Sequence, residues 1–431
     1  VKEVALSFQS KMANMSIGGA HQREREGHTL MNADVIATTL SSCYTFQMEN
    51  LFGQASEKIP VCIVDEAAQA TELGTLIPLM LGVNTLILVG DPKQLPPTVI
   101  SEIAKDRGLD ESLFYRARRN FEIEKNDPIL MLDTQYRMVE EIVRWPNMFF
   151  YRGSLKTDSN VAPLPFLHYR VLHHSSHQES NDSNMGEARL VMKLVQGMVE
   201  ELLKDPEHEN ATIGIITPYR RQRRILMEML RDRYKLLEDK FEKPKKIAKN
   251  GAHNDNSFDY VSVSSPTSSN GTEIPEKNGI DLDASKVVDE SGFWENEDQS
   301  TTPIHEMTLE EKVASEKEKA EQEEARRLYG KLKSIQVNTV DSFQGQERDI
   351  IIVSCVRSRG IGFVNDPNRL CVTLTRAKHT LILCGNFNTF KNNTMWRMLL
   401  VDAEIRRAYV KLRAEPTSEM IMKHVIKGKS I

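Results

Sequence analysis

The sequence has few cysteines, no long hydrophobic run and no strong excess of one charge. No segment reaches the roughly 18 consecutive apolar residues of a membrane span, and no signal peptide is apparent, so we expect no membrane partner. The net charge of −5 does not by itself indicate a nucleic-acid partner, but an average hides local basic clusters and excludes nothing. The five cysteines form no CxxC pair, which favours buried free thiols in a reducing compartment over disulfides or a metal site. They are Cys43, Cys62, Cys355, Cys371 and Cys384.

Short apolar runs recur along the 431 residues, a length that allows two or more domains of roughly 100–200 residues. The runs alternate with helix-compatible stretches such as 187–204. Strands that alternate with helices predict βαβ units, and therefore an α/β fold with parallel sheets. The runs lie at 34–38, 61–64, 85–90, 129–132, 212–217, 335–340, 350–356 and 380–385.

Residues 240–306 interrupt this pattern. They are rich in Ser, Asn, Asp, Glu and Gly and poor in aliphatic residues, which predicts a disordered insertion. Residues 308–328 open with a Thr308/Glu311 capping box and predict a solvated helix that leads back into the fold. The KPKK at 243–246 is typical of a nuclear-localisation patch, so we expect the nucleus, with the cytoplasm as a second location.

The apolar run at 61–64 ends in two adjacent carboxylates, Asp65 and Glu66. In open parallel sheets, ligands bind at the carboxyl ends of the strands. Two acids at such a place either bind a metal ion or cap the next helix. The stretch alone leaves both interpretations open.

Two further runs are followed by polar side chains. GDPKQLPP (90–97) carries Gln94 on a proline-bounded loop, and an amide side chain can both donate and accept. ILMLDTQYRM places Gln135, Tyr136 and Arg137 after the run at 129–132. Arginine suits phosphate and tyrosine offers a flat face for a base. An interface ion pair with a stacked tyrosine is the alternative.

TPYRRQRRIL (217–226) predicts the start of a basic helix. Thr217 is the expected N-cap and Pro218 the first helical turn. Such a helix start is an anion site, which makes it the best candidate for nucleic-acid phosphates. A solvated basic face is the alternative. The candidate contacts are Thr217, Pro218, Tyr219, Arg220, Arg221, Arg223 and Arg224.

Two more motifs carry polar residues beside apolar runs. VDSFQGQE (340–347) places Gln344, Gly345 and Glu347 in a turn, where backbone and side chains can meet ribose or phosphate. NRLCVTLTRAK places Arg376 in a Thr-Arg-Ala turn. We expect each motif to stand at the end of a strand, and the conjunction of all of them is hard to produce by chance.

Taken together, DEAAQ, GDPKQLPP, QYRM, TPYxxQ, VDSFQGQE and NRxxVTLTRAK resemble motifs II to VI of the superfamily 1 RNA/DNA helicases. Within that group they are most similar to the up-frameshift-like branch and its senataxin-type helicases. The resemblance implies two RecA-like domains, with ATP and Mg²⁺ between them and single-stranded RNA or DNA across the top. RNA–DNA hybrids are a further expected substrate, and we expect a monomer.

The implied domains are a partial first RecA-like domain at 1–126 and a second one at 127–400. The second contains a low-complexity and helical insertion at 236–330, and a C-terminal tail occupies 401–431.

The resemblance also implies roles for five residues in catalysis. Asp65 would hold Mg²⁺ through water and Glu66 would orient the attacking water. Gln94 would sense the γ-phosphate. Arg137 and Arg376 would contact that phosphate, because phosphoryl transfer depends mainly on positioning and charge neutralisation. The resemblance therefore favours the metal-binding interpretation of Asp65 and Glu66 over the helix-cap interpretation.

Four other residues would contact the nucleotide by the same resemblance. Tyr136 would stack near the adenine and Glu347 would reach the ribose, while Gln135 and Gly345 would lie beside the nucleotide. The sequence departs from the family pattern in two places: Val139-Glu140 follows QYRM instead of His-Pro, and Cys371 replaces an asparagine.

A P-loop of the form GxxxxGK[ST], whose backbone N–H groups cradle phosphates, does not occur upstream of Asp65. The only GK[ST] is Gly428-Lys429-Ser430, and the position of its first glycine is Lys423. We therefore expect the chain to begin inside the first RecA-like domain. The predicted function is an ATP-dependent helicase, and the alternative is a non-catalytic nucleic-acid-binding or scaffold protein on a degenerate helicase core.

Overall fold

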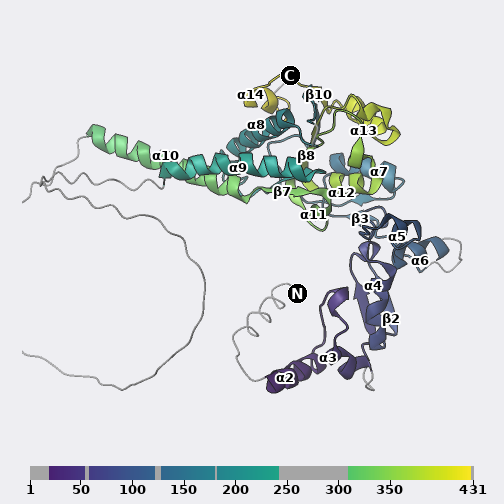
Figure 1. The fold of residues 1–431 in the computed structure, drawn as a ribbon. Helices are drawn as coiled ribbons and strands as arrows, with labels where there is room; N and C mark the ends of the chain where they lie inside the picture. The colour runs from purple at the N-terminus through teal and green to yellow at the C-terminus, as the bar shows by residue number, and fades with distance from the viewer. Residues whose placement is uncertain (1–18, 54–57, 122–127, 180–181, 242–308, 429–431) are drawn as a thin grey trace, which may run out of the picture. The chain divides into compact units, whose positions relative to one another are not determined.

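The computed structural model describes residues 19–53, 58–121, 128–179, 182–241 and 309–428 (Figure 1). The chain divides into two compact units, Val1–Phe241 with Glu323–Ile431, and Glu242–Gln322. In the second unit the described residues belong to the first half of α10 (Leu309–Ser334). The predictions for the disordered insertion beyond the end of α9 (Arg220–Phe241), the KPKK patch and the Thr308 cap lie outside the described residues.

The N-terminal part, residues 19–121, contains a two-stranded parallel sheet. Val61 pairs with Thr85 and Val64 with Leu88. The strands are β1 (Val61–Val64) and β2 (Thr85–Leu88). The helices are α2 (Gly19–Met31), α3 (Phe46–Met48), α4 (Glu72–Leu76), α5 (Glu102–Asp106) and α6 (Leu113–Phe121). The shorter helical turns are η1 (Leu40–Ser42), η2 (Glu49–Gly53), η3 (Ala67–Gln69) and η4 (Ile77–Leu81).

The second part, residues 128–241 and 323–428, is built on a six-stranded sheet in the order β10-β5-β9-β8-β6-β7. All neighbouring strands are parallel, as the alternation of apolar runs and helices predicts. The strands are β5 (Tyr169–His173), β6 (Ile213–Thr217), β7 (Gln336–Thr339), β8 (Arg348–Ser354), β9 (Ala377–Gly385) and β10 (Tyr409–Lys411). A separate parallel pair joins β3 (Thr134–Gln135) and β4 (Lys156–Thr157).

Helices cover both faces of the six-stranded sheet (Figure 1). On one face α8 (Met185–Leu202), α9 and α14 (Ser418–Met422) enclose a core that includes Leu194, Leu226 and Ile421. On the other face the core includes Trp145, Phe343 and Trp396. The helices there are α7 (Glu140–Phe150), α11 (Val340–Phe343), α12 (Pro367–Leu374) and α13 (Thr394–Ile405). The turns η5 (Gly362–Asn365) and η6 (Phe390–Asn392) complete this side.

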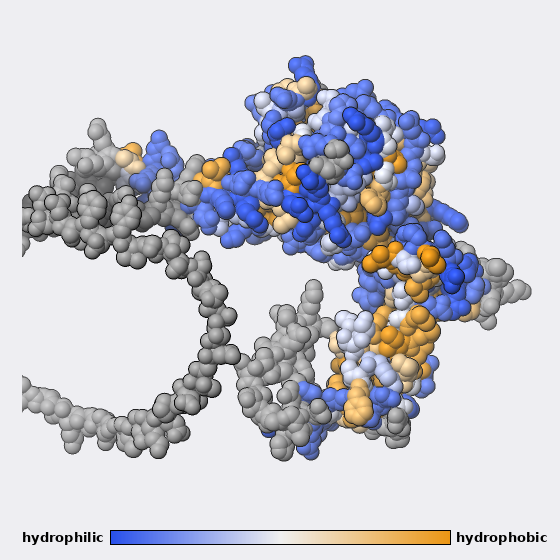
Figure 2. Space-filling view, in the orientation of Figure 1, coloured by the Kyte–Doolittle hydropathy of each residue, from blue (hydrophilic) through white to orange (hydrophobic). Residues whose placement is uncertain are grey.

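The two sheets differ in how well they are covered. Central residues of the six-stranded sheet such as Ile351 and Ile382 are fully buried, whereas Ile63 of β1 is 66% exposed and Ile87 of β2 is 44% exposed. Figure 2 shows the difference on the face in view: hydrophobic residues gather on the surface over β2 and α4, and the second part is mainly hydrophilic there. The strand order and the two covered faces confirm the α/β fold class with parallel sheets.

Two of the eight predicted strands are wrong. The runs at 34–38 and 129–132 have no strand in the structure, and Leu130 and Leu132 are more than four-fifths exposed. An apolar run favours a strand only where a neighbouring strand offers a ladder to pair with. The other six runs form β1, β2, β6, β7, β8 and β9, and the stretch 187–204 forms most of α8.

The free thiols are as predicted: Cys43, Cys355, Cys371 and Cys384 are buried, and Cys62 is partly buried. Within the described residues, none of the helices combines the length and the apolar character that a membrane crossing needs. Residues 401–431 contribute β10 to the edge of the sheet and α14 to the cover over α8. The predicted domain boundaries stay a prediction.

Candidate functional site

The two acids after β1 do not cap a helix. The Asp65 carboxylate accepts the backbone N–H of Glu66 at 3.0 Å. Glu66 precedes η3 but its side chain makes no capping hydrogen bond, and the cap of the next α-helix is Thr71, which accepts from Gly74 N–H. The helix-cap alternative for the two carboxylates is therefore wrong.

The backbone of Glu66 adopts a left-handed conformation, with φ 53° and ψ 36°. For a residue other than glycine this conformation costs on the order of 1–3 kcal/mol, and such residues cluster at functional sites. The Glu66 carboxylate accepts hydrogen bonds from the amides of Gln69 at 3.0 Å and Gln344 at 3.4 Å. Both carboxylates remain exposed, so they are available to a ligand.

The loop after β2 lies directly against these acids. A Cβ atom on Gly90 would come within 2.9 Å of the Ala68 backbone nitrogen, so only glycine allows this approach. Asp91 accepts hydrogen bonds from the side chains of Gln94 at 3.0 Å and Tyr151 at 2.6 Å. Burial, followed by the nearby Cys371 and Asp91, raises the pKa of Tyr151 well above its usual value, so this phenol stays a donor to Asp91.

Arg376 is the most unusual side chain of the site, because it is only 2% exposed. Its guanidinium donates to the carbonyl of Val372 at 3.0 Å, to Thr375 Oγ1 at 2.9 Å and to Gln94 Oε1 at 3.2 Å. Among the residues that the structure describes, no carboxylate forms an ion pair with it. Burial, and next the positive charge of Arg137, lower the pKa of Arg376 to about 10. Burying a cation among neutral partners is unfavourable unless an anion compensates its charge.

The QYRM turn presents Arg137 and Tyr136 differently. The Gln135 amide closes the turn itself: its oxygen accepts Met138 N–H at 2.8 Å, and its nitrogen donates to Thr157 Oγ1 at 3.1 Å. Arg137 donates to the carbonyl of Thr375 at 3.1 Å, which brings it next to Arg376. Tyr136 is 69% exposed, so its ring is free to stack. Gln135 thus positions Arg137, and its side chain is already occupied.

Glu347 lies between two cations. Its carboxylate pairs with Arg137 and with Lys378, the latter at 2.9 Å. Burial raises the pKa of Glu347, but the hydrogen bonds from Lys378 and Arg137 outweigh it and hold the pKa below its ordinary value. Gly345 has φ 72°, and a Cβ atom added to it would meet none of the described residues within 4 Å, so the turn leaves open space beside it. Glu347 is therefore ionised and holds Arg137 in place.

The sequence suggested that each motif stands at the end of a strand, and for two motifs this is wrong. Glu347 and Arg376 directly precede β8 and β9, and Arg376 follows the helix α12. These two residues lie at the amino ends of the parallel strands, whereas Thr217 ends β6 at the opposite edge. The predicted residues consequently form two groups. One joins Arg376, Glu347 and the QYRM turn to the loops after β1 and β2, and the other follows β6.

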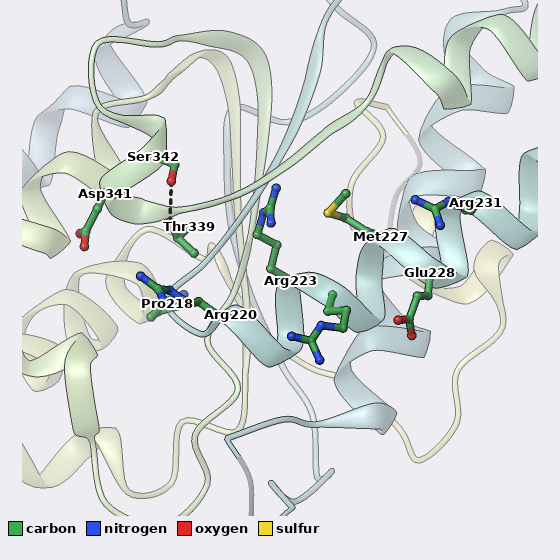
Figure 3. A pocket seen from close by; sticks show the side chains of 10 residues that line it. Pro218, Arg220, Arg223, Met227, Glu228, Arg231, Thr339, Asp341 and Ser342 are labelled. Atoms are coloured by element: carbon green, nitrogen blue, oxygen red, sulfur yellow. Dashed lines mark hydrogen bonds between the residues drawn. The ribbon is translucent and has the colours of Figure 1, made fainter. Parts of the chain in front are cut away.

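The second group lines a cavity of about 610 Å³ at the carboxyl ends of β6 and β7 (Figure 3). Four arginines of α9 reach it, and in Figure 3 the other wall carries Thr339, whose hydroxyl hydrogen-bonds Ser342 at 2.9 Å. Over the described ranges no acid pairs with the three arginines at 220, 224 and 231, while the fourth donates to the Val337 carbonyl at 2.9 Å. The lining is Pro218, Arg220, Arg223, Arg224, Met227, Glu228, Arg231, Thr339, Asp341 and Ser342.

Three predicted contacts lie elsewhere. The expected N-cap at Thr217 is wrong: Thr217 ends β6, α9 begins at Arg220, and the buried Thr217 hydroxyl has no hydrogen-bond partner among the described residues. Tyr219 is 4% exposed beneath the Arg357 guanidinium, which lies 5.8 Å from the ring centroid. Arg221 is exposed but outside the cavity lining.

Sequence reasoning missed several members of both groups. Arg231 could have been found, because positions 220, 224 and 231 fall on one face of a helix with 3.6 residues per turn. Asp341 and Ser342 belong to the VDSFQGQE motif, and Lys378 is the last residue of NRLCVTLTRAK. Tyr151 carries no signal, because its partner Asp91 is distant in sequence.

Asp65 fits Mg²⁺ and Arg376 fits a phosphate of ATP. Mg²⁺ is usually held by one or two carboxylates together with waters and substrate phosphates, which matches an exposed Asp65 at the end of a strand. In the described part of the chain no group of three acids, histidines or cysteines forms a metal site without such help. The buried, unpaired charge of Arg376 fits a phosphate.

Comparisons with known proteins agree with this geometry. Two protein-family models, each described as an AAA domain, match residues 6–102 and residues 109–275 with 306–388. "Probable helicase senataxin" of Homo sapiens is 31% identical over 403 residues, which cover 89% of this chain and 11% of that protein. "Helicase sen1" of Schizosaccharomyces pombe is 31% identical over 395 residues, covering 88% and 17%. "Helicase SEN1" of Saccharomyces cerevisiae is 29% identical over 407 residues, covering 89% and 13%.

The chain thus spans less than a fifth of the length of these relatives. A solved structure titled "The structure of PRRSV helicase" aligns with a TM-score of 0.29 and 14% identity over 77% of this chain and 36% of that chain, which is too weak to carry an argument. The second family model alone matches more than half of the chain. With its helicase relatives and its ordered set of motifs, the chain belongs to the superfamily 1 helicases of the up-frameshift-like branch.

Proposed function

We propose that this chain forms the hydrolytic half of an ATP site and the strand-binding surface of an RNA/DNA helicase. The observation that carries the proposal is Arg376, a guanidinium buried among neutral partners and directed by Gln94. Burying a charge without a counter-charge is unfavourable unless a ligand supplies one. ATP with Mg²⁺ would supply that charge, together with the phosphoanhydride bond whose hydrolysis drives movement along a strand.

The residues around Arg376 divide the work between them. Asp65 is placed to hold Mg²⁺ through water, and Glu66 to orient the attacking water. The hydrogen bond from Arg376 to Gln94 couples the turn before β9 to the loop after β2, so a phosphate that binds one of the two side chains would also affect the position of the other. Such positioning and charge neutralisation is what phosphoryl transfer requires.

The nucleotide's other contacts follow from exposure and charge. The exposed ring of Tyr136 is available for the adenine. Glu347 is ionised and could accept from the ribose, provided that Lys378 or Arg137 releases one of its oxygens. Gln135 acts through the turn that holds Arg137, and Gly345 leaves the room that the sugar needs.

Single-stranded RNA or DNA is the proposed ligand of the α9 cavity. Arginines at 220, 224 and 231 line it and form no ion pair with an acid in the part of the chain that the structure describes; phosphates are the anions that such groups bind in nucleic-acid complexes. RNA–DNA hybrids are the proposed duplex substrate, from the resemblance of the motifs to senataxin-type helicases, and the nucleus is the proposed location, from the KPKK at 243–246.

The test is strand-stimulated ATP hydrolysis. The 431 residues contain no GxxxxGK[ST] upstream of Asp65, so the nest of N–H groups and the lysine that anchor the β- and γ-phosphates are not supplied. Misalignment of about 1 Å can cost on the order of 10²-fold in rate. We expect negligible turnover by these residues alone and robust turnover once a P-loop segment is joined to them. Robust turnover by the 431 residues alone would contradict this assignment.

A non-catalytic nucleic-acid-binding protein is the second candidate, and the α9 cavity is the observation that favours it. The α9 cavity does not depend on a P-loop, so strand binding would survive without hydrolysis. No turnover in a P-loop-containing form, combined with normal strand binding, would select this candidate.

A further inference from the structure

The loop between β8 and α12 places an exposed aromatic side chain beside the α9 cavity. Phe363, in the turn η5, is 59% exposed. Its ring centroid lies 5.9 Å from that of Tyr219, the residue immediately before the arginine series of α9. The Arg369 guanidinium lies 5.7 Å from the Phe363 centroid. An apolar ring thus lies among the charged side chains of Arg369 and of the α9 cavity.

The loop is anchored on both sides of this ring, so its exposure does not come from a loose segment. Gly362 has φ 57°, and a Cβ atom there would come within 2.5 Å of the Tyr219 hydroxyl oxygen. After the ring, Val364 is buried and its carbonyl accepts the indole N–H of Trp396 at 2.7 Å. The backbone on either side is fixed, and the phenyl ring remains at the surface.

Arg369 connects the ring to the cavity. It pairs with Asp341 and with Asp366, each at 3.1 Å, and Asp341 lines the cavity. With two carboxylates beside it, this guanidinium is largely neutralised and is a weak phosphate ligand. Its position over the Phe363 ring instead orients the ring through a cation–π contact.

We propose that Phe363 is a stacking platform for a base of the single strand whose phosphates bind in the α9 cavity. The proposal rests on the proposed strand-binding function and adds a contact that reads the base face. Base–aromatic stacking tolerates any sequence, because every base has a π-face. Contacts of this kind suit a protein that moves along a strand, because they hold each base without selecting among them.

The test compares a single-stranded DNA with a strand of the same length made of abasic deoxyribose phosphates. Phe363→Ala should weaken binding of the base-containing strand roughly tenfold and leave binding of the abasic strand unchanged. The salt dependence of binding should stay the same, since no phosphate contact is lost. Phe46→Ala is the matched control, because Phe46 is 80% exposed and lies outside both groups of site residues.

A Phe363→Trp variant gives an independent measurement. Its binding should match that of the parent chain, and its added fluorescence should be quenched by the base-containing strand but not by the abasic one. Unchanged affinity of Phe363→Ala for the base-containing strand, or an equal loss for both strands, would overturn the proposal. If the parent chain binds neither strand, the proposed function itself fails. If arginine substitutions in α9 weaken binding while Phe363→Ala does not, only this inference fails.

Discussion

Replacing Arg376 by methionine should separate stability from function. The pKa of Arg376 lies at about 10, against an ordinary value of 12.5, and each pKa unit corresponds to 1.36 kcal/mol. Burial, together with the positive charge of Arg137, therefore disfavours the charged form by about 3 kcal/mol. Against this stand three hydrogen bonds, to Val372, Thr375 and Gln94, each worth about 1.5 kcal/mol because the donor is charged. The hydrogen bonds outweigh the cost by only about 1–2 kcal/mol, and methionine fills the space with a flexible apolar chain.

The substitution should thus lower the free energy of unfolding by only about 1–2 kcal/mol, measured by urea denaturation followed through the fluorescence of the buried Trp145 and Trp396. In a P-loop-containing form, the same substitution should lower strand-stimulated ATP turnover by a factor on the order of 10³, the lower end reported for a lost arginine finger.

Arg170→Met is the matched control. Burial also lowers the pKa of Arg170, and its guanidinium likewise donates to carbonyls, those of His424 at 2.8 Å and Tyr169 at 3.2 Å. It lies outside both groups of site residues, so turnover should not change. A destabilisation of about 3–5 kcal/mol by Arg376→Met, as for a truncated buried ion pair, would show that Arg376 is a structural residue and would refute the reasoning.

Two other predictions concern strand binding and acid stability. Replacing Arg220 and Arg224 by alanine should weaken binding of all single-stranded sequences alike and reduce the salt slope by roughly 0.7 per lost contact, whereas Lys411→Ala with Arg413→Ala should change neither; an unchanged slope in the first variant would leave α9 with a merely solvated basic face. Burial, and next the neighbouring histidine His168, lower the pKa of His379 from 6.5 to about 3. The unfolded chain therefore binds more protons than the folded one between pH 3 and 6.5, and the free energy of unfolding should fall as the pH drops through this range, by up to about 1.4 kcal/mol per pH unit. His379→Gln should flatten that fall in denaturation curves measured across the range. An equal fall in both proteins would assign the acid sensitivity to other groups.

The sequence was a good guide to strands that are buried on both faces. The runs at 350–356 and 380–385 form the centre of the sheet, where continuous apolar residues are required. The run at 129–132 is equally apolar but finds no partner strand and lies exposed. Periodicity cannot distinguish these cases, since pairing depends on residues far away in the chain. The strand β10 went unnoticed for the same reason: it pairs with β5, more than two hundred residues earlier.

The identity of the site residues was more predictable than their surroundings. Asp65, Glu66 and Gln94 were singled out from their places after apolar runs, and the structure joins their loops through the Gly90 backbone contact. The burial of Arg376 had no local signal, because it results from α12 and the Gln94 loop closing around it. The division into two groups of residues also had no local signal, because it depends on which loops the fold brings together.

The central claim is that Glu66 serves hydrolysis, and strand-stimulated ATP turnover by a P-loop-containing form with Glu66→Gln tests it most directly. Glutamine keeps the shape of the side chain and its hydrogen bonds to Gln69 and Gln344 but removes the carboxylate charge that orients water. We predict that turnover is abolished while nucleotide binding, measured by titration with a fluorescent ATP analogue, stays within a few-fold of the parent. A normal kcat in the Glu66→Gln protein would contradict the account and leave Glu66 as a polar residue beside a short helical turn.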